Sequence, residues 1–118
     1  MHEIKMPKPK TCSVCSIAML AGISYDDAVR LSFGAEPEDF SMSLDRMEAA
    51  LVKAGLKTRR LSKMPKNPAR NMLVECKSKS EGWWHYIVYD ATRKKFLDPI
   101  PNGRPLEDYE LYSCIEIL

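Results

Sequence analysis

Three residues of this chain have side chains that together can activate a nucleophile: Cys12, His85 and Asp98. A cysteine thiolate attacks carbonyl carbons, and it needs a base, usually a histidine that a third polar group orients. The chain has only two histidines, and His2 lies in the terminal segment, where chains are most mobile. His85 is therefore the candidate base, and Asp98 is the candidate orienting group.

Cys12 follows a segment, Met6-Pro7-Lys8-Pro9-Lys10, that its two prolines keep extended. We expect Thr11 to act as the N-cap of a helix that runs from Cys12 to a stop at Gly22. The first turn of a helix presents unpaired amides and a partial positive charge, which favour a thiolate and a developing oxyanion. Cys12 is thus placed for nucleophilic chemistry; the structural alternative is a small buried residue at a helix start.

His85 lies within Trp83–Tyr89, a stretch rich in aromatic and β-branched residues that predicts a strand. A buried imidazole needs a polar partner, because desolvation without one is costly. The alternative to catalysis is a core histidine satisfied by such a partner. Trp83, Trp84 and Tyr86 either pack in the core or line a cleft beside His85.

Asp98 follows a short predicted strand, Lys95–Leu97, that comes after a turn near residues 91–92. A two-residue turn there would pair His85 directly with Asp98. Ala-Thr suits such a turn poorly, which favours a longer loop. A register shift of two residues keeps both side chains on one face of the sheet, whereas a shift of one separates them. The alternative role for Asp98 is to cap the turn before Pro99.

The elements that must position these residues fall into two halves of the chain. Ser24 and Ser43 are expected N-caps of a second and a third helix, whose apolar residues recur at helical spacing, and Gly55 is expected to end the third. Strands are expected at residues 56–61, 71–77, 83–90, 95–97 and 111–118. Helices first and strands after predict an α+β fold with N-terminal helices packed on a C-terminal antiparallel sheet.

Length and composition predict one globular domain over residues 1–118, with residues 1–5 expected to be flexible. The chain is 45% hydrophobic and 29% charged, with a net charge of +2. Residues 57–79 carry eight bases and one acid but no aromatic residue, so a nucleic-acid partner is not expected. The longest apolar run, Ile17 to Ile23, is too short to span a membrane, and no apolar leader opens the chain. We therefore expect a cytoplasmic protein without a membrane partner.

The four cysteines allow two further interpretations. Cys12 and Cys15 form a C-x-x-C pair, but a thioredoxin-like redox site needs a preceding strand where this chain has prolines. A zinc site would use Cys12, Cys15, Cys76 and Cys114. The second pair is 38 residues apart and is not a zinc-knuckle spacing, so neither a metal nor another cofactor is expected.

The motifs around the three candidate residues resemble one family. Residues 11–25, Thr-Cys-Ser-Val-Cys-Ser-Ile-Ala-Met-Leu-Ala-Gly-Ile-Ser-Tyr, are similar to the catalytic helix of the bacteriocin-processing, double-glycine-type cysteine peptidases. His85-Tyr86-Ile87-Val88-Tyr89 resembles the His-aromatic-Val-Val strand of that family, and Phe96-Leu97-Asp98-Pro99 resembles its Asp-Pro element. The order and spacing of the motifs agree over about residues 6–118.

This resemblance implies a papain-like fold and a bacterial or phage thiol hydrolase acting on a peptide or protein. Cys12 would be the nucleophile, His85 the general base and later acid, and Asp98 the group that fixes the imidazole tautomer. Cys12 is assigned rather than Cys15, which would face the core one turn further along. Family members often cut after Gly-Gly and are often fused to transporters, whereas this chain predicts a free-standing domain.

Two departures from the family bear on activity. Met6 stands where the family has its oxyanion-hole glutamine, and the chain contains no glutamine. A thioether cannot donate a hydrogen bond, so the backbone amide of Cys12 and a group from Ser13, Asn71 or a lysine would have to replace it. Ser13 also replaces the glycine that follows the nucleophile. The alternative function is therefore a weakly active or inactive papain-like domain that binds peptides or proteins.

Overall fold

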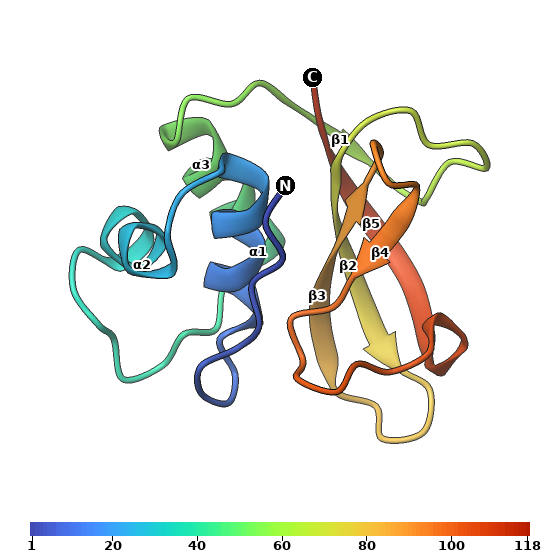
Figure 1. The fold of residues 1–118 in the computed structure, drawn as a ribbon, viewed down its shortest axis with the longest axis horizontal. Coiled ribbons are helices and arrows are strands. Elements are labelled where there is room, and N and C mark those ends of the chain that lie inside the picture. Colours follow the sequence, from blue (N-terminus) through green and yellow to red (C-terminus); the bar gives the residue numbers. More distant parts are fainter.

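The computed structural model describes all 118 residues and has an α+β fold, as predicted. A helical layer packs against one antiparallel sheet, and the two lie side by side in Figure 1. The helices are α1 (Cys12–Ala21), α2 (Tyr25–Phe33) and α3 (Leu44–Lys53). The strands are β1 (Thr58–Leu61), β2 (Met72–Ser78), β3 (Trp84–Asp90), β4 (Lys95–Leu97) and β5 (Tyr109–Ile117), and a 3-10 turn, η1 (Leu106–Asp108), precedes β5.

The helix boundaries follow the predicted caps. Ser24 and Ser43 each accept a hydrogen bond from the backbone amide three residues on, and so satisfy first-turn donors of α2 and α3. Gly22 adopts a left-handed conformation with φ of 68° directly after α1, which only glycine does without strain. The third helix ends at Lys53, two residues before the predicted stop at Gly55.

Thr11 is the N-cap residue of α1 by position, but the predicted capping hydrogen bond is wrong. Its hydroxyl instead donates to the Lys8 carbonyl at 2.8 Å, within a tight turn in which Lys10 has a φ of 65°. The helical hydrogen bonds begin with the Cys15 amide, which donates to the Thr11 carbonyl. The amides of the first turn, including that of Cys12, therefore precede the helical ladder.

The five strands form one sheet in the order β1-β5-β2-β3-β4, with every neighbouring pair antiparallel. The β3–β4 connection spans residues 91–94, so the longer loop was the correct alternative. Val88 pairs with Leu97, a shift of two residues from direct pairing of His85 with Asp98. Because β4 reaches only as far as Val88, the first half of β3 has no neighbouring strand on that side.

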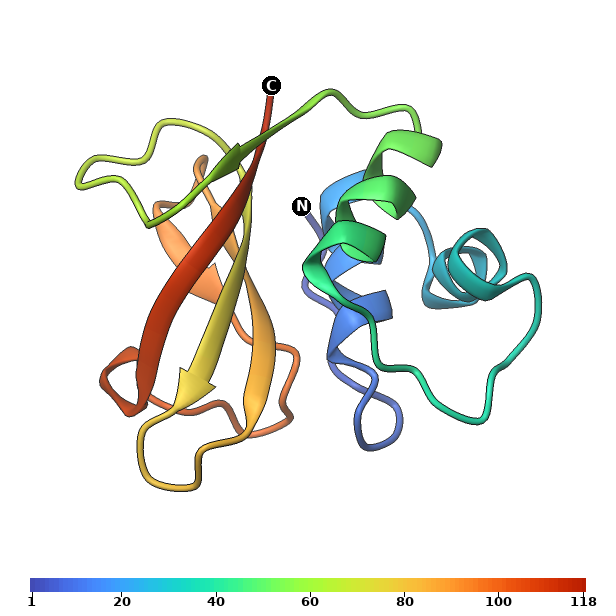
Figure 2. The same ribbon diagram turned by 180° about the vertical axis from the view of Figure 1, so that it is seen from behind.

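Helix α1 is the centre of the core, since every residue from Ser13 to Leu20 is buried. It lies between the sheet and α2, while α3 packs beside it and contacts β1, as Figures 1 and 2 show from opposite sides. The helically spaced apolar residues of α3 are not all buried: Met47 and Leu51 face the core, whereas Val52 is 54% exposed. No single helix has the length and apolar content to cross a membrane; α1 and α2 meet that criterion only as a pair bent by 108°.

The amino-terminal segment runs alongside the chain that leaves β4. The Met6 amide donates to the Pro99 carbonyl at 2.7 Å, and the Lys5 ammonium donates to the Asp98 carbonyl at 2.9 Å. Met1 and Ile4 are half-buried against the main core. These contacts hold the residues before α1 against the edge of the sheet that β4 leaves uncovered.

Candidate active site

His85 and Asp98, predicted to meet, form a hydrogen-bonded pair. The imidazole Nε2 lies 2.7 Å from Asp98 Oδ1, and the His85 side chain is almost wholly buried. The shift of two residues in the β3–β4 register leaves both side chains on the same face of the sheet, as required for this contact. The bound carboxylate orients the ring and leaves its Nδ1 atom free to act on another group.

Asp98 is itself held by two further donors. The Tyr109 hydroxyl donates to Oδ2 at 2.7 Å, and the Ile100 amide donates to Oδ1 at 3.0 Å. Burial alone would raise the pKa of the Asp98 carboxyl, but the hydrogen bonds from His85, Ile100 and Tyr109 outweigh it and hold that pKa below its usual value. Asp98 therefore stays ionised beside the imidazole.

Tyr109 and Trp83 enclose the His85 ring. Tyr109 stacks on it with centroids 5.6 Å apart, and Trp83 meets it edge-on, also at 5.6 Å. The Trp83 indole nitrogen donates to Glu81, whose carboxylate also pairs with Arg104 at 2.5 Å. This packing keeps water from the histidine–aspartate pair, which strengthens their electrostatic interaction.

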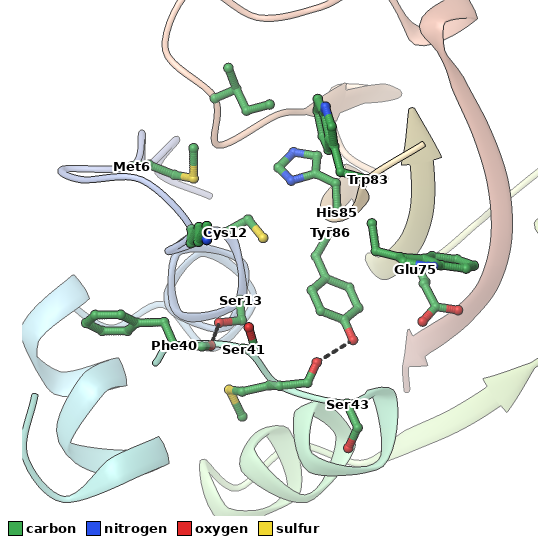
Figure 3. Close-up of a pocket in the computed structure, with 14 residues that line it drawn as sticks. Met6, Cys12, Ser13, Phe40, Ser41, Ser43, Glu75, Trp83, His85 and Tyr86 are labelled. Atoms are coloured by element: carbon green, nitrogen blue, oxygen red, sulfur yellow. Dashed lines mark hydrogen bonds between the residues drawn. The ribbon is translucent and has the colours of Figure 1, made fainter. Parts of the chain in front are cut away.

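Cys12 lies at the start of α1, half-buried, with its side chain directed toward β3 below the His85 ring (Figure 3). Burial on its own would lower the pKa of His85. Hydrogen bonding to Asp98 and to Cys12, together with their charges, outweighs burial and raises that pKa to about 9. His85 is therefore protonated at neutral pH, and its imidazolium lies beside the Cys12 side chain.

Cys12 and His85 open into a cavity of about 710 Å³ between the helical layer and the sheet. Residues 40–43, in the loop between α2 and α3, form one wall. The Ser13 hydroxyl holds that loop by donating to the Phe40 carbonyl at 2.9 Å, and the Tyr86 hydroxyl donates to the Met42 carbonyl at 2.8 Å. The lining residues include the three aromatic side chains of the β3 region that were candidates for the cleft: Trp83, Trp84 and Tyr86.

Met6 lines the same cavity, with its thioether beside Cys12 (Figure 3). Two of the proposed replacement donors are unsuitable. The Ser13 hydroxyl is bound to Phe40, and Asn71 accepts a hydrogen bond from the Ala91 amide outside the cavity. The backbone amide of Cys12 and the ammonium of Lys10, the only lysine or arginine that lines the cavity, remain as donors.

The other three cysteines are buried thiols. Burial raises the pKa of Cys15 and of Cys114 to about 11, and it raises that of Cys76 further. Cys15 is fully buried, which confirms that it faces the core. The Cys12–Cys15 pair is therefore poorly suited to redox exchange. No three His, Cys, Asp or Glu side chains, the four cysteines included, are arranged to hold a metal ion.

Sequence reasoning missed Tyr109 and Glu75 as parts of the site. Tyr109 is the first residue of β5, and no local motif connects it to Asp98, eleven positions earlier. Glu75 breaks the apolar run of β2 and lines the cavity, and an acidic residue inside a predicted strand was the only available signal. Both depend on strand register, which the sequence leaves undetermined in these strands.

Comparisons of this chain with protein-family models, with curated proteins and with solved structures each find no match.

Proposed function

We propose that this protein is a thiol hydrolase with a papain-like arrangement, a cysteine peptidase that cleaves its substrate through Cys12, His85 and Asp98. One observation carries the proposal: a half-buried cysteine at a helix start lies beside an imidazole whose other nitrogen is 2.7 Å from a half-buried carboxylate. A nucleophile, a base and an orienting group are the minimum that such catalysis requires. The helix-then-sheet order supports the proposed similarity to the double-glycine-type peptidases.

In the proposed reaction the Cys12 thiolate attacks the scissile carbonyl carbon, and a C–S bond forms. His85 gives its proton to the leaving nitrogen as the C–N bond breaks, which leaves a thioester on Cys12. Water then attacks the thioester carbon while His85 takes its proton, and the acid product leaves as the thiolate is restored. Asp98 holds the imidazole in one tautomer through both steps.

Few hydrogen-bond donors are placed to stabilise the oxyanion that forms in this reaction. The first-turn amide of Cys12 supplies one donor, and the Lys10 side chain is the candidate for a second. Met6 supplies none. Since one oxyanion donor is worth about 10²–10³ in rate, we expect slow turnover.

A peptide-library digest tests the proposal. The wild-type protein is expected to release new amino termini, detected by mass spectrometry, and the Cys12→Ala variant is expected to release none. Cys15→Ala is the matched control because it removes a buried thiol outside the cavity, and it is expected to retain cleavage. Absence of cleavage by the folded wild-type protein, or cleavage that survives Cys12→Ala, would contradict the proposal.

A second candidate is a papain-like binding module that holds peptides without cutting them. Met6 favours it, because this side chain takes the place of an oxyanion donor. The two candidates differ in their response to Met6→Gln. If the site is catalytic, an added amide donor should raise the cleavage rate by up to ~10²-fold, whereas the isosteric Met6→Leu should not. A binding module would gain no cleavage from either change.

A further inference from the structure

Glu75 is the one acidic side chain that lines the Cys12 cavity, and no basic side chain pairs with it. It is half-buried, and burial raises the pKa of its carboxyl against the opposing charge of Arg60. Holding an ionised carboxylate there without a partner is unfavourable. A carboxylate placed in this way favours any cation that enters the cavity.

The nearby basic side chains have other partners. The Arg60 guanidinium donates to Asp45 at 2.7 Å and to Glu48 at 3.1 Å. The Lys77 ammonium lies over the Trp84 ring, 5.4 Å from its centroid. No basic side chain of the protein therefore forms an ion pair with Glu75, and the contact of Lys77 with Trp84 shows that this indole accepts a cation.

The strand register places Glu75 next to the reactive centre. Glu75 pairs with Tyr86, while Cys76 pairs with His85, so the backbone at Glu75 is one residue and one strand away from His85. Their side chains leave opposite faces of the sheet, yet both line the cavity. The pairing of β2 with β5 also shifts between Val74 and Cys76, at Glu75 itself. Such bulges redirect side chains and recur beside active sites. Figure 3 shows Glu75 across the cavity from Cys12, on the far side of Tyr86.

We propose that Glu75, Trp84 and Tyr86 form a subsite for a cationic side chain, lysine or arginine, of the peptide on which Cys12 acts. This inference rests on the proposed function, and it adds the substrate class. A carboxylate with exposed aromatic faces is the combination that proteins use to bind ammonium and guanidinium groups. Trp84 is 56% exposed, and because Lys77 lies over its ring and Tyr112 packs against it, a substrate cation would compete with Lys77 for the indole.

The position of the basic residue in the substrate follows from the same register. One residue step and one strand spacing separate His85 from Glu75, roughly 6 Å between Cα atoms. An extended peptide advances about 3.3 Å per residue. The cationic side chain should therefore lie within about three residues of the bond that Cys12 attacks.

The test uses N-acetylated peptide aldehydes that carry lysine, norleucine or glutamate at one of the three positions before the aldehyde. Acetylation removes the terminal amine, so a preference for lysine reports the side chain. At one position the lysine peptide is expected to modify Cys12 about fivefold faster than the norleucine peptide, as for a partly exposed ion pair. Glu75→Gln should remove that preference, Glu75→Lys should transfer it to glutamate, and Glu107→Gln, an exposed acid outside the cavity, should leave it unchanged.

The same peptides as carboxamides, titrated by NMR into the Cys12→Ala variant, measure binding without chemistry. If Cys12 proves unreactive while these peptides still show a Glu75-dependent preference for lysine, the hydrolase proposal fails and the subsite stands. Equal binding of the lysine and norleucine peptides at all three positions, or a lysine preference that survives Glu75→Gln, would overturn the subsite.

Discussion

At the scale of single residues, the site depends on the balance of burial and charge around His85. The ring is buried by Trp83 and Tyr109, which disfavours a positive charge, yet Asp98 and Cys12 hold its pKa at about 9. Both of these partners, Asp98 and Cys12, could be identified as candidate site residues from the sequence. The sequence does not show that the hydroxyl of Tyr109, the first residue of β5, donates a hydrogen bond to Asp98, which follows β4.

Tyr109 acts as a positioning residue, since its hydroxyl touches Asp98 rather than the reacting atoms. We predict that Tyr109→Phe lowers kcat about tenfold with little change in KM, as the loss of one hydrogen bond to a charged group allows. Without the Tyr109 hydrogen bond, the Asp98 carboxylate stabilises the His85 imidazolium more strongly and raises the pKa of His85. The alkaline limb of the pH–rate profile should therefore move to higher pH. A variant with a normal melting curve and an unchanged kcat and pH profile would contradict this role.

His85 also predicts how stability depends on pH. Its pKa rises from 6.5 to about 9 on folding, so the folded state binds the proton more tightly than the unfolded state. The resulting stabilisation is fully present below about pH 6.5 and is lost as the pH rises through about 9. Urea unfolding of wild type and His85→Gln across this range should show a stability difference that shrinks with rising pH. A constant difference would contradict the assignment.

At the scale of elements, the helices could be predicted closely and the register of the strands could not. Capping serines, Gly22 and apolar spacing are local signals, and the three helices follow them. Strand pairing depends on loop length and on neighbours far along the chain. The Ala-Thr turn left two registers that both bring His85 and Asp98 to one face, and the shift of β5 at Glu75 had no local signal.

The cap of α2 gives a test at this scale. Ser24→Ala removes the acceptor for the Asp27 amide and is predicted to lower the free energy of unfolding by about 1 kcal/mol. Ser32, in the same helix, has a buried hydroxyl with no partner, so Ser32→Ala is predicted to cost little or nothing. Chemical denaturation measures both, and equal losses would show that the Ser24 cap contributes nothing specific.

At the scale of the whole molecule, the site lies where the two layers meet. Cys12 comes from the helical layer, His85 comes from β3 of the sheet, and Asp98 directly follows β4 (Figure 1). The order of helices before strands was enough to predict the α+β class. It could not predict that residues 5 and 6 bind the chain beyond β4, because that contact spans more than ninety residues. This contact is what places Met6 beside the nucleophile.

The most direct test of the central claim is the dependence of Cys12 reactivity on His85. The rate at which a peptide aldehyde modifies Cys12 is measured in wild type, His85→Gln and His2→Gln. We predict that His85→Gln slows the modification about 10²-fold and that His2→Gln, which changes the only other histidine, leaves it unchanged. Equal rates in folded wild-type and His85→Gln proteins would show that the imidazole does not activate Cys12, and would contradict the account.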